Sequence, residues 1–159
     1  MTHKSMVKIT LKPSEMAVCR IIGSMRSLVA RGNNVKDIKV GKQDGSLADI
    51  QGFIAEYAFA KKYNCFFDLG LEPRSGSADG TINGDRYDIK STTYQSGKLL
   101  ASLKVNPDVD RYVLAIVDNN TVSLIGWAYK TELIKEENLR DLGHGKGYCL
   151  EQTQLHQFK

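Results

Sequence analysis

The sequence has few cysteines, few prolines and no long hydrophobic run. Its three cysteines are far apart and form no Cys-x-x-Cys pair, so the pattern predicts reduced, mostly buried thiols rather than a disulfide framework or a zinc knuckle. No apolar run approaches the ~18 residues that cross a bilayer, and the first residues lack an apolar signal core. We therefore expect a cytoplasmic protein with no membrane partner.

Low-complexity tracts, internal repeats and linkers are also missing. A length of 159 residues, 42% hydrophobic and 25% charged, is typical of one soluble globular domain, which we expect to span residues 1–159. Neither charge sign dominates, but residues 1–50 hold nine Lys/Arg against four Asp/Glu. We expect a basic helix-loop region over about residues 1–45. Such an excess fits a nucleic-acid partner, although many ordinary domains show it too.

The spacing of apolar residues predicts two helices ahead of any sheet. The first begins at Lys12-Pro13-Ser14 and ends at Gly32-Asn33-Asn34. Its expected core-facing stripe is Val18, Ile21, Ile22, Met25, Leu28 and Val29. Three arginines fall mostly outside this stripe, on a face that is either simply solvated or in contact with phosphates: Arg20, Arg26 and Arg31.

The second helix is expected to begin with Ser46 as N-cap and to end at Asn64, after a polar loop over residues 33–45. Short strands follow at 66–67, 81–82, 86–90, 99–105, 112–117 and 122–127, after an initial strand at 7–11. Thr131 is expected to cap a helix over 132–138, and residues 143–147 to form a loop before a last strand. This order predicts an α/β (α+β) fold with a mixed central β-sheet flanked by helices.

The Asn83-Gly84 turn predicts the register of a hairpin. With these two residues as the loop, Asp79 lies opposite Asp88, and Lys90 shares the face of Asp88. Like charges directly opposite each other destabilise a sheet, unless a cation between them offsets the repulsion. Two carboxylates ~5 Å apart can bind Mg²⁺ or Mn²⁺, and an adjacent lysine can orient or help to deprotonate the attacking water of a nuclease.

Glu56 lies off the apolar stripe of the second helix, one turn after Gly52. A glycine at that place lets a helix approach a sheet closely, so that Glu56 could reach the metal of the hairpin. The simpler alternatives stay open for each residue. Glu56 could be a solvated helix residue, Asp79 a turn residue before Gly80, and Asp88 with Lys90 an ion pair on an exposed strand.

At this point the chain resembles the PD-(D/E)XK nuclease superfamily, in particular its small phage-encoded members and the Holliday junction resolvases. The resemblance covers about residues 47–135. It rests on the segments Gly52-Phe-Ile-Ala-Glu56, Ser77-Ala-Asp79-Gly and Tyr87-Asp88-Ile-Lys90, and on the strands around 111–117 and 122–128. One departure from the family pattern is Ala78, where proline often precedes the acidic residue.

The resemblance implies a restriction-endonuclease-like core and a Mg²⁺-dependent deoxyribonuclease, as an endonuclease that cuts DNA. By this likeness Asp79 and Asp88 are the principal metal ligands, Glu56 is a further acidic residue of the site, the carbonyl of Ile89 adds a ligand, and Lys90 is the catalytic lysine. A phage-encoded member would act in the host cytoplasm. A second copy of the motif, Asp37-Ile38-Lys39, lies in the polar loop without an opposed carboxylate and is interpreted as a solvated segment.

Further residues are candidates for contact with DNA. Ser91 and Thr92 are either strand residues or phosphate contacts, and His144 either touches DNA or belongs to a surface loop. Because so small a core offers little surface to surround DNA, we expect a homodimer with two sites. The alternative function is a catalytically inactive DNA-binding domain of the same fold, and a metal-stabilised assembly module is a third.

Overall fold

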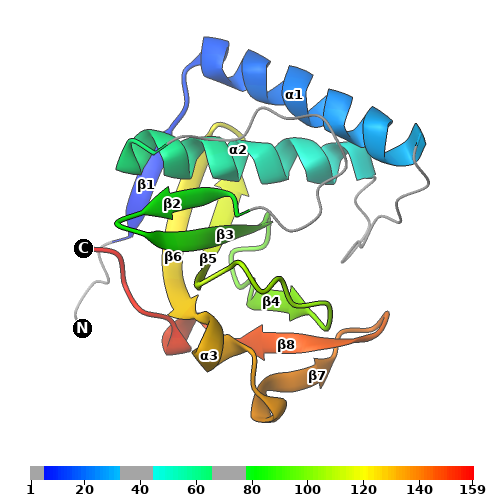
Figure 1. Cartoon of the computed structure of the whole chain (residues 1–159). Coiled ribbons are helices and arrows are strands. Elements are labelled where there is room, and N and C mark those ends of the chain that lie inside the picture. Colours follow the sequence, from blue (N-terminus) through cyan, green and yellow to red (C-terminus); the bar gives the residue numbers. More distant parts are fainter. Residues whose placement is uncertain (1–5, 33–44, 66–77) are drawn as a thin grey trace.

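The computed structural model describes residues 6–32, 45–65 and 78–159. Its elements follow one another along the chain as β1 (Val7–Thr10), α1 (Pro13–Gly32), α2 (Gly45–Tyr63), β2 (Gly80–Ile82), β3 (Asp85–Thr92), β4 (Leu99–Ser102), β5 (Arg111–Asp118), β6 (Thr121–Tyr129), α3 (Lys130–Leu133), η1 (Glu136–Asn138), β7 (Leu139–Asp141), β8 (Lys146–Leu150) and η2 (Gln152–Gln154). Figure 1 shows α1 and α2 stacked on one side of the central sheet and a smaller sheet on the other side.

The central sheet has five strands in the order β1-β6-β5-β3-β2. Strands β3 and β5 are parallel, whereas the other neighbours are antiparallel, so the predicted mixed sheet flanked by helices is confirmed. A second, antiparallel sheet has the order β4-β8-β7. It was not predicted as a separate sheet, because β7 is a three-residue strand with no pattern of its own.

Each face of the central sheet covers its own apolar core. The first core lies between this sheet and the helices, and it includes Phe53, Phe59, Tyr87, Ile89 and Val113. The second core lies on the opposite face, toward the smaller sheet, and it includes Leu99, Tyr112, Leu114, Leu133 and Leu150. Residues of β3 and β5 therefore alternate between the two cores, as strand geometry requires.

The first helix buries a different face from the one predicted. Of the expected stripe, the side chains of Val18, Ile21, Met25 and Leu28 are exposed, Ile21 by 57% and Leu28 by 67%. The buried face instead carries the small residues Cys19, Gly23 and Ser27, spaced four apart. A Cβ at Gly23 would lie 2.6 Å from the Cα of Ile50, so this small ridge lets α1 lie very close to α2.

Most predicted elements are present, with shifted ends. Helix α2 begins at Gly45, so Ser46 lies inside it, and helix α3 begins at Lys130 with Tyr129 as N-cap, so Thr131 does not cap it. Of the loop predicted at 33–45, residues 33–44 lie outside the described residues and Gly45 already belongs to α2; the strand predicted at 66–67 also lies outside the described residues. The three cysteines are free thiols, with Cys19 buried and Cys65 and Cys149 half-buried. In the part of the chain that the structure describes, no helix is long and apolar enough to span a membrane.

Candidate functional site

The β2–β3 hairpin has the predicted turn and register. Asn83 and Gly84 both have positive φ, 51° and 87°, which is the backbone that a two-residue Asn-Gly turn requires. The paired residues are Gly80 with Tyr87, Thr81 with Arg86 and Ile82 with Asp85. The N–H of Asp79 donates to the carbonyl of Tyr87 at 2.8 Å, so Asp79 bonds to the residue that already pairs with Gly80, and the paired residues do not extend to Asp79 and Asp88.

Asp88 and Lys90 lie on one face of β3, as predicted. The Nζ of Lys90 is 3.1 Å from Oδ2 of Asp88, and the two side chains are 40% and 20% exposed. Both residues are in register with β5 residues of the second core, Asp88 with Tyr112 and Lys90 with Leu114. Burial raises the pKa of Tyr112 to about 12, and the nearby charge of Asp88 adds to this shift. The pair therefore lies on the sheet face that is opposite to α2.

Asp79 directly precedes β2, and its side chain forms a hydrogen bond with the backbone of β3. Its Oδ2 accepts a hydrogen bond of 2.8 Å from the backbone N–H of Ile89. The N–H and C=O of one strand residue point to the same edge, so the carbonyl of Ile89 also points to the edge where Asp79 lies. Asp79, Asp88 and the Ile89 carbonyl thus meet on one short stretch of the hairpin.

Glu56 is directed to the other helix. Its Oε2 lies 3.2 Å from Nη1 of Arg26 in α1, and both side chains are largely buried. The guanidinium of Arg26 also lies over the ring of Phe53, 4.7 Å from its centroid. The predicted close approach at Gly52 is not found among the described residues, because a Cβ there would meet none of them within 4 Å. The structure therefore brings Glu56 to α1 by a contact that the sequence did not indicate.

The donor set of the hairpin suits a hard divalent cation. Among residues 6–32, 45–65 and 78–159, no three side chains of His, Cys, Asp or Glu are grouped closely enough to hold a metal ion. Mg²⁺, however, is commonly bound through one or two carboxylates and keeps several waters. Asp79 and Asp88, on neighbouring segments of one hairpin and next to a carbonyl, provide oxygens of this kind. Glu56 would have to leave Arg26 before it could join them.

The three arginines predicted to contact DNA differ in their surroundings. Arg20 is exposed and borders a small hollow with Pro13 and Asn119. Arg26 is held in its ion pair with Glu56 and its side chain is 13% exposed, so it does not lie on a solvated face, and its contact with phosphate stays a prediction. The side chain of Arg31 lies outside the described residues.

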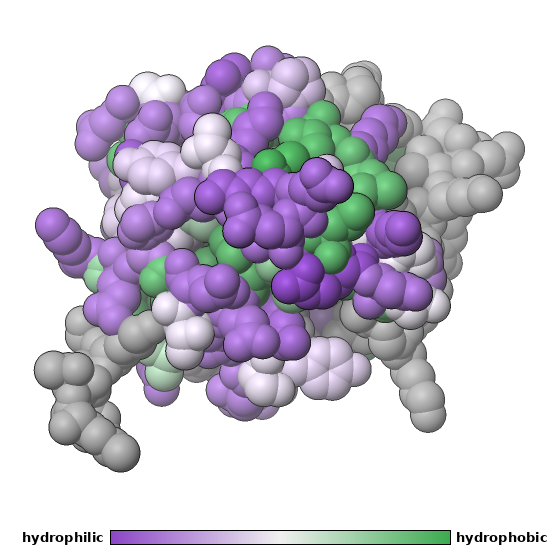
Figure 2. All heavy atoms as spheres, turned by 90° about the horizontal axis from the view of Figure 1, so that it is seen from below, coloured by the Kyte–Doolittle hydropathy of each residue, from purple (hydrophilic) through white to green (hydrophobic). Residues whose placement is uncertain are grey.

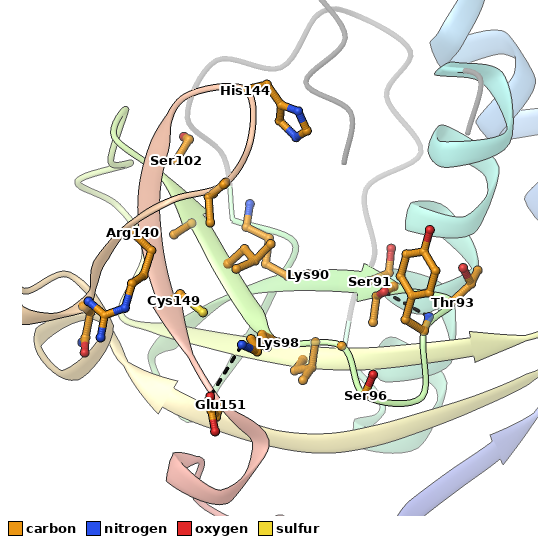
Figure 3. Close-up of a pocket in the computed structure, with 18 of the residues that line it drawn as sticks. Lys90, Ser91, Thr93, Ser96, Lys98, Ser102, Arg140, His144, Cys149 and Glu151 are labelled. Carbon is orange, nitrogen blue, oxygen red and sulfur yellow. Dashed lines mark hydrogen bonds and ion pairs between the residues drawn. The ribbon is translucent and has the colours of Figure 1, made fainter. Parts of the chain in front are cut away.

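A cavity of about 1150 Å³ lies beside the hairpin, between β3, β4, the β7–β8 hairpin and the beginning of α2. Lys90, Ser91 and Thr92 all line it. Figure 3 shows Lys90 extending from β3 toward the space beneath the tip that carries His144. The cavity therefore connects the three consecutive residues that the sequence placed at the site.

Other cavity residues come from segments that the sequence analysis did not connect with the site. They are Tyr94, Lys98, Arg140 and Lys146. Lys98 pairs with Glu151 at 3.5 Å, and Nη1 of Arg140 donates to the carbonyls of Glu137 and Leu139. In the sequence, the glycine-rich run at 143–147 and His144 within it were the signals for this wall, and neither indicated which segments lie next to it.

Hydrogen bonds between Arg86 and Asp110 join the beginnings of β3 and β5. Asp110 accepts hydrogen bonds from the backbone N–H and the Nε of Arg86, at 2.8 and 3.2 Å. Its own N–H donates to the carbonyl of Arg86 at 2.9 Å. The hydrogen bond from the Arg86 side chain, followed by the one from its backbone, lowers the pKa of Asp110. This linkage holds the parallel pair that places Asp88 beside Tyr112.

Comparisons with family models, with curated proteins and with solved structures find no match for this chain. Its function must therefore be argued from its own residues and their geometry.

Proposed function

We propose that this protein is a metal-dependent nuclease that hydrolyses phosphodiester bonds of DNA. The observation that supports this proposal best is the ion pair of Asp88 and Lys90 at 3.1 Å, with Asp79 on the adjoining edge of the same hairpin. Lys90 also lines a cavity of about 1150 Å³. An ion pair on an exposed strand would need neither the carboxylate of Asp79 on the adjoining edge nor the cavity.

Each residue has a distinct part in this proposal. Asp79 and Asp88, with the carbonyl of Ile89, would hold Mg²⁺ or Mn²⁺, which when bound lowers the pKa of a water ligand and screens charge on the phosphate. Lys90 orients the attacking water and places its positive charge next to the developing negative charge. The hydroxyls of Ser91 and Thr92 donate hydrogen bonds to phosphate oxygens in the cavity.

The proposal also includes a restriction-endonuclease-like core and endonucleolytic cleavage by a homodimer. The mixed sheet, with α2 ahead of the β2–β3 hairpin, supports the first part. Two copies would carry two sites, one for each strand of a duplex or branched DNA. Glu56 enters the site in this scheme by exchanging its partner Arg26 for the metal.

A plasmid-nicking assay tests the function. Supercoiled DNA is incubated with the protein and Mg²⁺, Mn²⁺ or EDTA, and the same series is run with Lys90→Ala. We expect nicking with either metal, and its loss both with EDTA and in the variant. Salt-sensitive binding without nicking would instead indicate a catalytically inactive DNA-binding domain. If the protein neither binds nor nicks DNA, the third candidate remains, a metal-stabilised assembly module. A stability that depends on metal, without DNA binding, would support that candidate.

A further inference from the structure

The cavity beside Lys90 has two unlike walls. One wall is the turn after β3, which carries the aromatic ring of Tyr94, and the other is the β7–β8 hairpin with its basic tip. Lys90 of β3 also lines this cavity. An exposed aromatic ring and cationic side chains that line one groove are the combination that single-strand binding proteins use, with bases on the ring and phosphates on the cations.

Tyr94 is unusually exposed for a residue in an ordered turn. The turn is closed by a hydrogen bond from the N–H of Gly97 to the carbonyl of Tyr94 at 2.9 Å, and the N–H of Tyr94 donates to Oγ1 of Thr92 at 3.2 Å. The residue is nevertheless 56% exposed. Within the described residues its ring stacks on no other aromatic ring or cation, in contrast to Trp127 and Tyr129, which pack with Arg111. Tyr94 therefore presents a free ring face at the cavity.

The opposite wall ends in a well-defined tip. Gly143 and Gly145 have φ of 92° and 128°, and hydrogen bonds of 2.8 Å from Gly143 to Asp141 and from Leu142 to Gly145 close the turn. Between these glycines, His144 is exposed and lines the cavity. The neighbouring Lys146 is exposed too; it lies opposite Asp141 in the β7–β8 pairing, but within the described residues no acidic side chain forms an ion pair with it.

The surface around the smaller sheet agrees with a polar ligand. Figure 2 shows that hydrophilic side chains cover most of this side of the molecule, with an apolar area among them. Hydroxyl groups are common on the cavity lining, from Ser91, Thr92, Thr93, Ser96 and Ser102. Such a lining can form hydrogen bonds with phosphate and sugar oxygens along a strand. A site for a small apolar molecule would instead be lined mainly by hydrophobic side chains.

We infer that the cavity accepts a single, unpaired strand of DNA, with one base stacked on Tyr94 and the flanking phosphates held by Lys146 and His144. This inference deepens the proposed function and rests on it, because it places the phosphate next to Lys90. In a duplex the faces of the bases are already stacked on their neighbours, so Tyr94 finds a partner only where the strand is unpaired. The ring accepts any base, so the preference is for strandedness and not for sequence.

Binding is measured by fluorescence anisotropy in EDTA, which separates it from cleavage. The probes are a labelled DNA oligonucleotide, a blunt duplex of the same sequence, and an RNA strand of that sequence. We expect the wild type to bind the single DNA strand more tightly than the duplex. Tyr94→Ala should weaken single-strand binding about tenfold and change duplex binding by less than about twofold, while Tyr94→Phe should retain wild-type affinity.

The basic wall is tested by the dependence of log Kd on log salt. Lys146→Ala should reduce the slope for the single strand by about 0.7, the value for one lost phosphate contact. Lys135→Ala is the matched control, because Lys135 is an exposed lysine that does not line the cavity, and its slope should equal that of the wild type. Thermal unfolding of each variant confirms that it is folded.

The two proposals fail in different ways. Equal affinity for strand and duplex with no effect of Tyr94→Ala, or tighter binding to the RNA strand, would overturn the single-strand inference even if the protein nicks plasmids. The expected binding pattern without any cleavage in Mg²⁺ would overturn the nuclease proposal and retain the strand-binding cavity.

Discussion

Arg26 in α1 and Glu56 in α2 face each other across the helix pair, with Nη1 of the arginine 3.2 Å from Oε2 of the glutamate. The two residues were expected to act separately, on DNA and on a metal. Their partly buried ion pair instead links the helices, at the place where Arg26 also covers Phe53. Removing either partner of this ion pair should be costly, because a largely buried charge has few water molecules to replace the partner that it loses.

The first prediction concerns this pair. Arg26→Ala and Glu56→Ala should each lower the free energy of unfolding by about 2 kcal/mol, and the double variant should lose clearly less than the sum. Urea unfolding of the four proteins gives the coupling energy. Arg20→Ala, on the exposed side of the same helix, is the control and should stay within about 0.5 kcal/mol of the wild type. Strict additivity would contradict an ion pair that stabilises the fold.

The second prediction compares two glycines in helices. Gly23→Ala should destabilise the protein by about 2 kcal/mol or more, because its Cβ would collide with the backbone of Ile50 at 2.6 Å. Gly52→Ala should instead stabilise it by about 0.5–1 kcal/mol, since the new methyl group meets nothing and alanine favours a helix. Thermal unfolding of both variants decides this, and a loss of stability in Gly52→Ala would show that Gly52 does permit a close approach.

Local signals in the sequence predicted the hairpin well. The Asn83-Gly84 turn determines both the register and the face of every residue in β3, so Asp88 and Lys90 could be placed together before the structure was known. Long-range packing is different. The contact of Arg26 with Glu56 joins residues that are thirty positions apart, and no local pattern encodes it.

The buried face of α1 shows a second limit. The large apolar residues recur at helical spacing, but so do the small residues Cys19, Gly23 and Ser27, and apolar spacing favours the first set. Close packing of α1 on α2 selects the second. The cavity could not be predicted for the same kind of reason, because its walls come from β3 and from β8, about fifty residues apart, and β7 is too short to recognise.

The third prediction is a pH dependence at Asp110. Hydrogen bonds from Arg86 lower its pKa below the ordinary value of 3.8. Because the pKa is lower in the folded state, the ionised carboxylate of Asp110 stabilises the fold, and this stabilisation is fully present above pH 3.8. It is lost as the pH falls through the pKa of Asp110 in the folded state. NMR titration should find Asp110 below 3.8 in the wild type and nearer to it in Arg86→Ala. An unchanged titration in the variant would mean that Arg86 is not the cause.

The fourth prediction concerns metal and stability. Asp79 and Asp88 bring two negative charges to one end of the hairpin, so a divalent cation should stabilise the folded state selectively. At about a hundredfold excess over its Kd, Mg²⁺ or Mn²⁺ contributes about 2.7 kcal/mol, which is about 5–10 °C in Tm for a chain of this size. Asp88→Asn should abolish this shift.

Asp118→Asn is the control for this experiment, since Asp118 is an exposed carboxylate at the far end of β5. Its Tm should rise with metal as in the wild type. A wild-type Tm that does not change with saturating Mg²⁺ or Mn²⁺ would show that the hairpin holds no metal.

The fifth prediction separates charge from chemistry at Lys90. Arginine in its place keeps the positive charge beside Asp88 but has a bulkier planar head and does not readily give up a proton. If Lys90 orients or helps to deprotonate the attacking water, Lys90→Arg should lose most of the single-turnover cleavage rate, while affinity for metal and DNA stays near wild type. This is the signature of an interaction that is made chiefly in the transition state.

Lys39, in the second Asp-Ile-Lys segment, provides the internal control, although it lies outside the described residues. Lys39→Ala should cleave at a near-normal rate, because nothing in the sequence places an opposed carboxylate beside it. A loss equal to that of Lys90→Arg would mean that the wrong triplet has been assigned. A Lys90→Arg rate within about threefold of wild type would reduce Lys90 to a phosphate contact, because positioning of a reacting water is sensitive to displacements of about 1 Å.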